Sequence, residues 1–115
     1  MAELVAYKVL TAEQLAALEH HGCFAGAPVD LADGFIHMST AAQLDETVAR
    51  HFAGRTDLAV AAVDLAAFGD ALKWEPSRGG DLFPHLYGLL TLDSLLAYGP
   101  LERERDGSIR LPTAG

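Results

Sequence analysis

The chain has 115 residues, of which 50% are hydrophobic, and its 8 basic and 16 acidic residues give a net charge of −8 at pH 7. This length predicts one domain, residues 1–115, with one hydrophobic core. An acidic chain without a basic stripe is repelled by phosphate backbones and by anionic lipid, so we expect no nucleic-acid partner and no membrane partner. Cys23 is the only cysteine, which excludes an internal disulfide, and it is expected to be a structural thiol. Because no apolar run is long enough for a signal peptide or a membrane span, we expect a cytoplasmic protein.

The first element predicted is a strand over residues 4–9, in which Lys8 faces away from the side that the valines and the tyrosine share. The four residues from Thr11 onward then have the spacing of a capping box, which predicts a helix over residues 12–21. Gly22 follows as the residue that ends this helix.

Residues 23–32 are predicted to form an ordered loop that leads into a tight turn at Gly34. A short core strand follows over residues 35–39. Because side chains alternate along a strand, His37 and Ser39 are expected on one face, roughly 6–7 Å apart.

A second capping box, from Thr40 to Gln43, predicts a helix over residues 41–53. Its unpaired amides and positive dipole end would lie beside His37 and Ser39, which suits an anionic or polar ligand group. The alternative interpretation is a buried histidine with satisfied hydrogen bonds and an ordinary helix cap.

The second half of the chain reads mainly as strands, with single helical turns at 64–69 and 91–94. The strands are predicted at residues 58–63, 72–75, 82–87 and 95–101. The run 58–63 is apolar on both faces and indicates a central strand, whereas Pro84 favours an edge position or a bulge for 82–87. A two-residue turn at Asp106 and Gly107 predicts a C-terminal hairpin. The fold class is therefore α+β: a bent or two-part, mostly antiparallel sheet of about six strands, with two helices packed on it.

Three places hold polar residues that a site can use. They are His37 with Ser39 and Thr40, Lys73 with Glu75 and Arg78, and His85 with Tyr87. A glutamate can orient or deprotonate a hydroxyl, an arginine can grip a phosphate in a bidentate manner, and a tyrosine offers a flat ring for stacking. We predict that six of these side chains converge on one cleft that has His37 at its floor and the helix start at Thr40 at one wall. The six are His37, Ser39, Glu75, Arg78, His85 and Tyr87. The alternative for Glu75 and Arg78 is that they pair with each other. No spacing in the sequence preorganises a metal site.

Several motifs, in order along the chain, resemble those of the small bacterial "domain of unknown function 952" family. They are YK at residues 7–8, GFIHMST at 34–40, LKWEP at 72–76 and FPHLYG at 83–88. The resemblance spans nearly the whole chain and implies a fold similar to that of ADP-ribosyltransferases.

In those enzymes a histidine, and a serine or threonine two residues later, hold the ribose of NAD, and His37 and Ser39 match that pattern. A tyrosine lies against the nicotinamide and a later glutamate contacts the ribose hydroxyl, whereas in this chain Glu75 precedes Tyr87.

The resemblance thus implies catalytic roles for His37 and Glu75. It implies ligand-binding roles for Ser39 and Tyr87, and the placement of the polar residues described above adds Thr40, Arg78 and His85 to the predicted ligand-binding residues. The expected partner is a small molecule, a nucleotide or an ADP-ribose-like ligand such as NAD, which an enzyme of the ADP-ribosyltransferase type would transform. The alternative is a non-catalytic module on the same fold that binds a small molecule or a protein.

Overall fold

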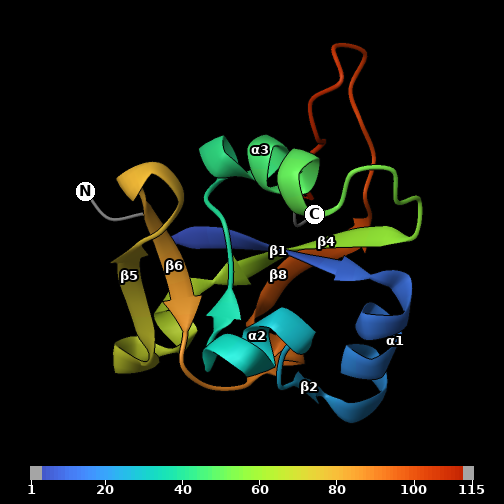
Figure 1. The fold of residues 1–115 in the computed structure, drawn as a ribbon. Helices are drawn as coiled ribbons and strands as arrows, with labels where there is room; N and C mark the ends of the chain where they lie inside the picture. The colour runs from blue at the N-terminus through green and yellow to red at the C-terminus, as the bar shows by residue number, and fades with distance from the viewer. Residues whose placement is uncertain (1–3, 113–115) are drawn as a thin grey trace.

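Three antiparallel β-sheets and three α-helices make up residues 4–112, the part of the chain that this computed structural model describes (Figure 1). The strands are β1 (Val5–Thr11), β2 (Cys23–Phe24), β3 (Ile36–His37), β4 (Leu58–Asp64), β5 (Leu72–Pro76), β6 (Leu82–Leu86), β7 (Leu90–Thr91) and β8 (Leu95–Pro100). The helices are α1 (Ala12–His21), α2 (Pro28–Asp33) and α3 (Ala41–His51), and single 3₁₀ turns lie at Leu65–Ala67, Gly69–Ala71, Arg78–Gly80 and Leu92–Ser94. The predicted α+β class is confirmed. None of the described helices is long and apolar enough to cross a membrane.

Two capping boxes start α1 and α3 at the predicted residues. The Thr11 hydroxyl accepts a hydrogen bond from the Gln14 amide at 3.0 Å, and the Gln14 side chain accepts one from the Thr11 amide at 2.9 Å. Thr40 and Gln43 form the same pair of bonds, at 3.3 and 3.0 Å. Each side chain replaces a partner that the first turn of a helix lacks, so both helix starts are encoded locally.

Helix α2 corrects the prediction that residues 23–32 form a loop. Pro28 is its first residue, where a missing amide hydrogen costs nothing. The Asp30 side chain reaches back to the Ala27 amide at 2.8 Å, and Gly34 ends the helix with φ at 88°. A helix of 6 residues offers less than two full turns of periodicity, which is why the hydrophobic pattern does not reveal it.

Strand β6 lies between β3 and β5, in the centre of its sheet, so the edge position predicted from Pro84 is wrong. The proline is tolerated because β3 pairs only with His85 and Leu86 and ends before Pro84. Beyond that point the Met38 amide donates to the Pro84 carbonyl at 3.1 Å. The Pro84 nitrogen has no hydrogen to donate to Met38 in return, so the pairing of β3 with β6 ends at this point.

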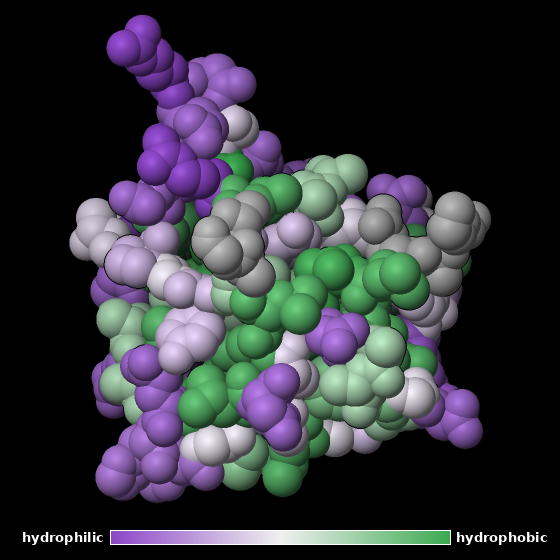
Figure 2. Space-filling view, turned by 180° about the vertical axis from the view of Figure 1, so that it is seen from behind, coloured by the Kyte–Doolittle hydropathy of each residue, from purple (hydrophilic) through white to green (hydrophobic). Residues whose placement is uncertain are grey.

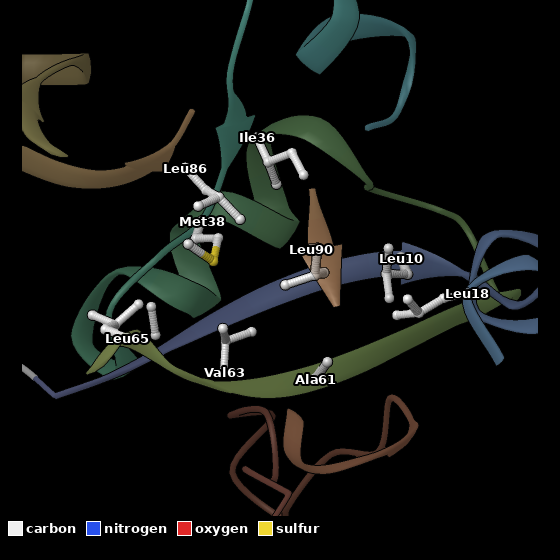
Figure 3. Packing of buried hydrophobic residues seen from close by; sticks show 10 residues of the cluster. Leu10, Leu18, Ile36, Met38, Ala61, Val63, Leu65, Leu86 and Leu90 are labelled. Carbon is white, nitrogen blue, oxygen red and sulfur yellow. The ribbon is translucent and has the colours of Figure 1, made fainter. Parts of the chain in front are cut away.

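The hydrophobic core lies on both sides of β4, which is buried along nearly its whole length, as its apolar run predicts. One cluster fills the space between the β1-β4-β8 sheet and the inner face of β3 and β6, where Ile36 and Leu86 lie across from Val63 (Figure 3). The other cluster includes Leu44 and Val48 of α3. The β3-β6-β5 sheet thus uses one face for the core.

The C-terminal hairpin extends away from the sheets (Figure 1). Figure 2 shows it as a hydrophilic projection from a face on which apolar residues gather. Its turn is longer than the predicted two residues, because the Glu104 amide donates to the Ser108 carbonyl at 2.8 Å and leaves three residues between them. Gly107, with φ at 91°, takes the left-handed conformation that such a loop requires.

Candidate functional site

The face of the β3-β6-β5 sheet that points away from the core carries four of the predicted site residues. Alternation turns the apolar residues of these strands inward and leaves His37, Glu75, His85 and Tyr87 on the other side, together with Phe35. His37 and His85 are direct partners across β3 and β6. We call these five residues the histidine face.

Glu75 joins the residues of the histidine face that come from β5 and β6. Its Oε1 lies 2.8 Å from His85 Nδ1 and accepts a hydrogen bond from the Tyr87 hydroxyl at 2.7 Å. These bonds, first that of His85 and then that of Tyr87, hold the pKa of the Glu75 carboxyl below its ordinary value. The same contact raises the pKa of the Tyr87 hydroxyl. Glu75 is therefore an ionised acceptor with a fixed direction.

His37 lies between two carboxylates. Its Nδ1 is 2.7 Å from Asp30 Oδ1, and its Nε2 is 2.9 Å from Asp33 Oδ2. The His37 side chain keeps 32% of its surface exposed, whereas the Asp30 side chain has none. The interpretation of His37 as a sealed core histidine therefore does not fit, since its ring reaches the surface and its partners are charged.

Behind His37 lies a buried ion pair between Lys8 and Asp30. Lys8 Nζ donates to Asp30 Oδ2 at 2.9 Å and to the His37 carbonyl at 3.0 Å. Asp30 also accepts from the amides of Ala27 and His37, at 2.8 and 3.1 Å. Four donors thus converge on one carboxylate, which fixes the position of His37 from both its ring and its backbone.

The pKa values of this pair follow from its burial. Burial alone would raise the pKa of Asp30, but the hydrogen bond from the His37 ring and the charge of Lys8 outweigh it and lower that pKa to about 2. Burial also lowers the pKa of Lys8, against the opposing effect of Asp30. Removing either charge would leave the other in a site with almost no water.

Phe35 is an aromatic ring at the centre of the histidine face. It stacks on His85 with ring centroids 4.1 Å apart, and it lies 4.6 Å from His37 and 5.2 Å from Tyr87. The two imidazole rings are themselves 5.5 Å apart. Flat rings and two histidine–carboxylate pairs are therefore in contact on one face of the sheet, where His85 is buried with 4% of its surface exposed.

Ser39 and Thr40 are not brought to this surface. Ser39 is 3% exposed, its hydroxyl lies 2.7 Å from that of Thr47, and its backbone pairs with Tyr7. The Thr40 hydroxyl caps α3. Arg78 lies in the 3₁₀ turn between β5 and β6, and its side chain is outside the described part of the structure. Four of the predicted residues thus lie on one face of the sheet, and Ser39 and Thr40 do not.

A hollow of about 270 Å³ adjoins the histidine face at Phe35. It is lined by Ala25, Asp30, Leu31, Gly34, Phe35, Ile36, Leu86, Gly88 and Leu89. None of the four predicted residues on the histidine face lines it, so His37 does not lie at its floor. The histidine face and the hollow are two neighbouring features that share the Phe35 ring.

The chemistry available here is proton transfer and recognition of hydroxyl or cationic groups. A histidine held by a carboxylate can accept or donate a proton with its ring in a fixed orientation. Among the described residues, no group of three or more histidine, cysteine, aspartate or glutamate side chains could hold a metal ion.

Sequence reasoning missed Lys8, Asp30, Asp33 and Phe35 as parts of the site. The signal for Lys8 was present, because strand alternation places it with Ala6 and Leu10 on a fully apolar face. A lysine on such a face requires a buried acidic partner. No local pattern identifies that partner as Asp30, which lies 22 residues away.

The comparisons with known proteins give a family and a fold. Residues 9–98 match the model of a family described as "Protein of unknown function (DUF952)". The chain is similar to the crystal structure of protein CC0527 from Caulobacter crescentus, with 42% identity, a TM-score of 0.84, and coverage of 93% of this chain and 94% of that chain. It is also similar to the solution NMR structure of CC0527, with 41% identity, a TM-score of 0.79, and coverage of 93% of this chain and 91% of that chain. No curated protein matches the chain significantly.

Proposed function

The chain belongs to the DUF952 family of proteins of unknown function, and we propose that its histidine face binds and transforms a nucleotide or ADP-ribose-like ligand of the NAD type. The observation that carries this proposal is the meeting of two histidine–carboxylate pairs on adjacent strands, with ring centroids 5.5 Å apart and Phe35 stacked beside them.

The charge of the face favours a ligand with a cationic ring and free hydroxyls. Glu75 is ionised, and Asp33 adds a second, half-exposed carboxylate next to His37. The pyridinium ring of NAD is cationic and flat, so it matches both the carboxylates and the exposed edge of Tyr87. Lys73, which is exposed on β5, and Arg78 in the following turn are the cations that we propose for the phosphates.

In the proposed reaction the bond between the ribose C1′ and the pyridinium nitrogen breaks, and its electron pair neutralises the ring, which leaves as nicotinamide. A lone pair of the acceptor forms the new bond to C1′, and the acceptor's proton passes to a histidine or carboxylate of the face. Glu75 accepts from a ribose hydroxyl and stabilises the positive charge that develops on the sugar. His37 orients the ribose, and Ser39 and Thr40 support it indirectly through α3.

The ADP-ribosyltransferase-like fold is part of this proposal, because the similar solved structures are of CC0527, whose description names no activity. What supports it is the HxS pattern at His37 and the position of Glu75 on the same face. The order of Glu75 and Tyr87 is the reverse of that in the resembled enzymes, and Glu75 reaches the Tyr87 hydroxyl across the sheet at 2.7 Å.

The second candidate is a module that binds the same kind of ligand, or a protein, without turnover. One observation favours it. Both ring nitrogens of His37 face carboxylates, and His85 Nδ1 and the Tyr87 hydroxyl both bond Glu75. A face whose polar groups satisfy one another can bind without reacting.

Thermal unfolding with NAD and with ADP-ribose at millimolar concentration tests binding, since a ligand that binds only the folded state must raise Tm. Release of nicotinamide from labelled NAD then separates the two candidates. Turnover supports the enzyme, and a raised Tm without turnover supports the binding module. If neither ligand raises Tm, the nucleotide proposal is wrong in both forms.

Two variants assign the effect to the histidine face. His37→Asn should abolish the ligand-induced rise in Tm while costing only about 0.5–3 kcal/mol of stability, and Glu75→Gln should retain binding and lose turnover. The matched controls are His51→Asn, at the exposed end of α3, and Glu104→Gln in the C-terminal hairpin, and both should behave as the wild type. If the controls lose the ligand-induced rise in Tm or the turnover to the same extent, the histidine face is not the binding site.

A further inference from the structure

The hollow beside Phe35 has the lining of a binding site for an uncharged ring. Its floor is apolar, because Ile36 and Leu86 are almost completely buried beneath it. Leu31 and Leu89 also line it, and each keeps more than half of its surface exposed. A molecule bound in a concave site can cover the apolar surface of exposed leucines around it.

Among the described residues, no open charge lines the hollow. Asp30 is the only ionisable one of them in its lining, and the Asp30 side chain is fully buried with four donors directed at it. An ionic group placed there would lose its hydration without gaining a partner, whereas a neutral group would not. The occupant is therefore uncharged.

Two residues that line the hollow, Gly88 and Leu89, have main-chain amides that are available as donors. The main-chain amides of Gly88 and Leu89 belong to no helix or strand and donate no hydrogen bond within the described part of the chain. Two adjacent unpaired amides next to an aromatic wall match a flat ring whose edge carries acceptor atoms. A volume of about 270 Å³ accommodates one such ring system, since benzene occupies a cavity of about 150 Å³.

We propose that this hollow binds the flat, uncharged heteroaromatic ring of a nucleoside, with the Gly88 and Leu89 amides donating to acceptors on the ring edge. Phe35 forms the wall that the hollow shares with the histidine face, so one ligand reaches both. This inference rests on the proposed function for the ligand as a whole, but the hollow can be tested with a nucleoside alone.

Gly88 offers a way to fill the hollow. Its φ is not positive, and an added Cβ would meet no atom within 4 Å, so Gly88→Leu introduces a side chain without backbone strain. Gly99→Leu in β8 is the matched control, because Gly99 shares both properties and lies in another sheet. A second variant, Leu89→Ala, removes an exposed wall without opening the core, and its control is the exposed Leu96→Ala.

The probes are adenosine, which carries the uncharged ring, nicotinamide mononucleotide, which carries the cationic ring, and NAD, which carries both. We expect Gly88→Leu and Leu89→Ala to raise the Kd of adenosine and of NAD at least about tenfold, the loss of one stacked ring. Neither variant should change the Kd of nicotinamide mononucleotide, and neither control should change any Kd.

Two outcomes overturn the inference: adenosine that does not bind at millimolar concentration, or adenosine that binds equally well to Gly88→Leu and to the wild type. Failure of the proposed function gives a different result: the Kd values of nicotinamide mononucleotide and of NAD are then the same for His37→Asn as for the wild type. Adenosine bound in the hollow, with no ligand on the histidine face, would leave this inference standing and reject the proposed reaction.

Discussion

Asp30 and Lys8 have unequal hydrogen-bonding environments although they form one ion pair. Asp30 accepts from Lys8, from the His37 ring and from two backbone amides, whereas within residues 4–112 the Lys8 ammonium bonds only Asp30 and one carbonyl. A buried charge that retains other partners costs less than one that retains none. The two residues should therefore respond differently to substitution.

We predict that Asp30→Asn lowers the free energy of unfolding by about 3–5 kcal/mol, because Lys8 then remains charged and buried without a counterion. Lys8→Met should cost less, since three N–H donors still bond Asp30. Urea denaturation measures both, with Asp33→Asn as the control at a half-exposed carboxylate that also contacts His37. A larger loss for Lys8→Met than for Asp30→Asn would contradict this account.

Stability should also depend on acid through Asp30. The pKa of Asp30 is lowered to about 2 in the folded protein, below its ordinary value of about 3.9 when unfolded. Its contribution, about 2 kcal/mol, is therefore complete above about pH 4 and is lost as the pH falls through about 2. Urea denaturation of the wild type and of Asp30→Asn between pH 5 and 2 should show a steeper decline in the wild type, and parallel curves would be evidence against it.

At the scale of single elements, the β3-β6-β5 sheet presents the candidate site and α3 supports it from one side. The Gln43 side chain of α3 donates to the Leu82 carbonyl of β6 at 2.8 Å, and Thr47 contacts Ser39 next to β3. These bonds attach the helix to both strands. The residues at the start of α3 thus hold the sheet, and the histidine face lies on the sheet itself.

We predict that Thr40→Ala lowers the free energy of unfolding by about 1 kcal/mol, the usual cost of losing an N-cap side chain. Thr11→Ala should cost a similar amount, because α1 begins with the same capping box. Any ligand of the histidine face should keep its affinity in Thr40→Ala once the change in stability is taken into account. A loss of affinity in this variant, restored by Thr40→Ser, would show that the hydroxyl contacts the ligand.

At the scale of the whole molecule, β4 separates two clusters of buried side chains, and the C-terminal hairpin completes the second one. Ile109 is 6% exposed and packs with the α3 cluster, while its amide donates to Asp45 of α3 at 2.9 Å. The remaining hairpin residues are largely exposed. The hairpin therefore contributes to stability mainly through this anchor.

We predict that Ile109→Ala lowers the free energy of unfolding by about 2–4 kcal/mol, as expected for a buried isoleucine whose loss leaves a cavity. Glu104→Gln, at the exposed part of the same hairpin, should change it by less than about 0.5 kcal/mol. Thermal and urea denaturation measure the free energy of unfolding of both variants. Equal effects would mean that Ile109 does not anchor the hairpin.

The sequence alone determined the features that depend on near neighbours. The capping boxes at Thr11 and Thr40, the left-handed Gly34 and the alternation that places His37, His85 and Tyr87 on one side of their strands all follow from residues within a few positions of each other. The apolar run of β4 likewise predicts burial on both faces. These signals locate most of the candidate site on one surface.

Only the tertiary structure decided which distant groups meet. Lys8 and Asp30 come together because β1 and α2 both lie next to the β3 segment, where Lys8 bonds the His37 carbonyl and Asp30 bonds the His37 amide. Pro84 lies in a central strand of its sheet. Ser39 does not share the face of His37 as alternation predicts, because β3 ends at His37 and the Ser39 hydroxyl bonds Thr47 of α3. Local patterns predict the face of a strand or helix on which a side chain lies. The partner of that side chain depends on how whole elements pack together, and no short stretch of sequence encodes that packing.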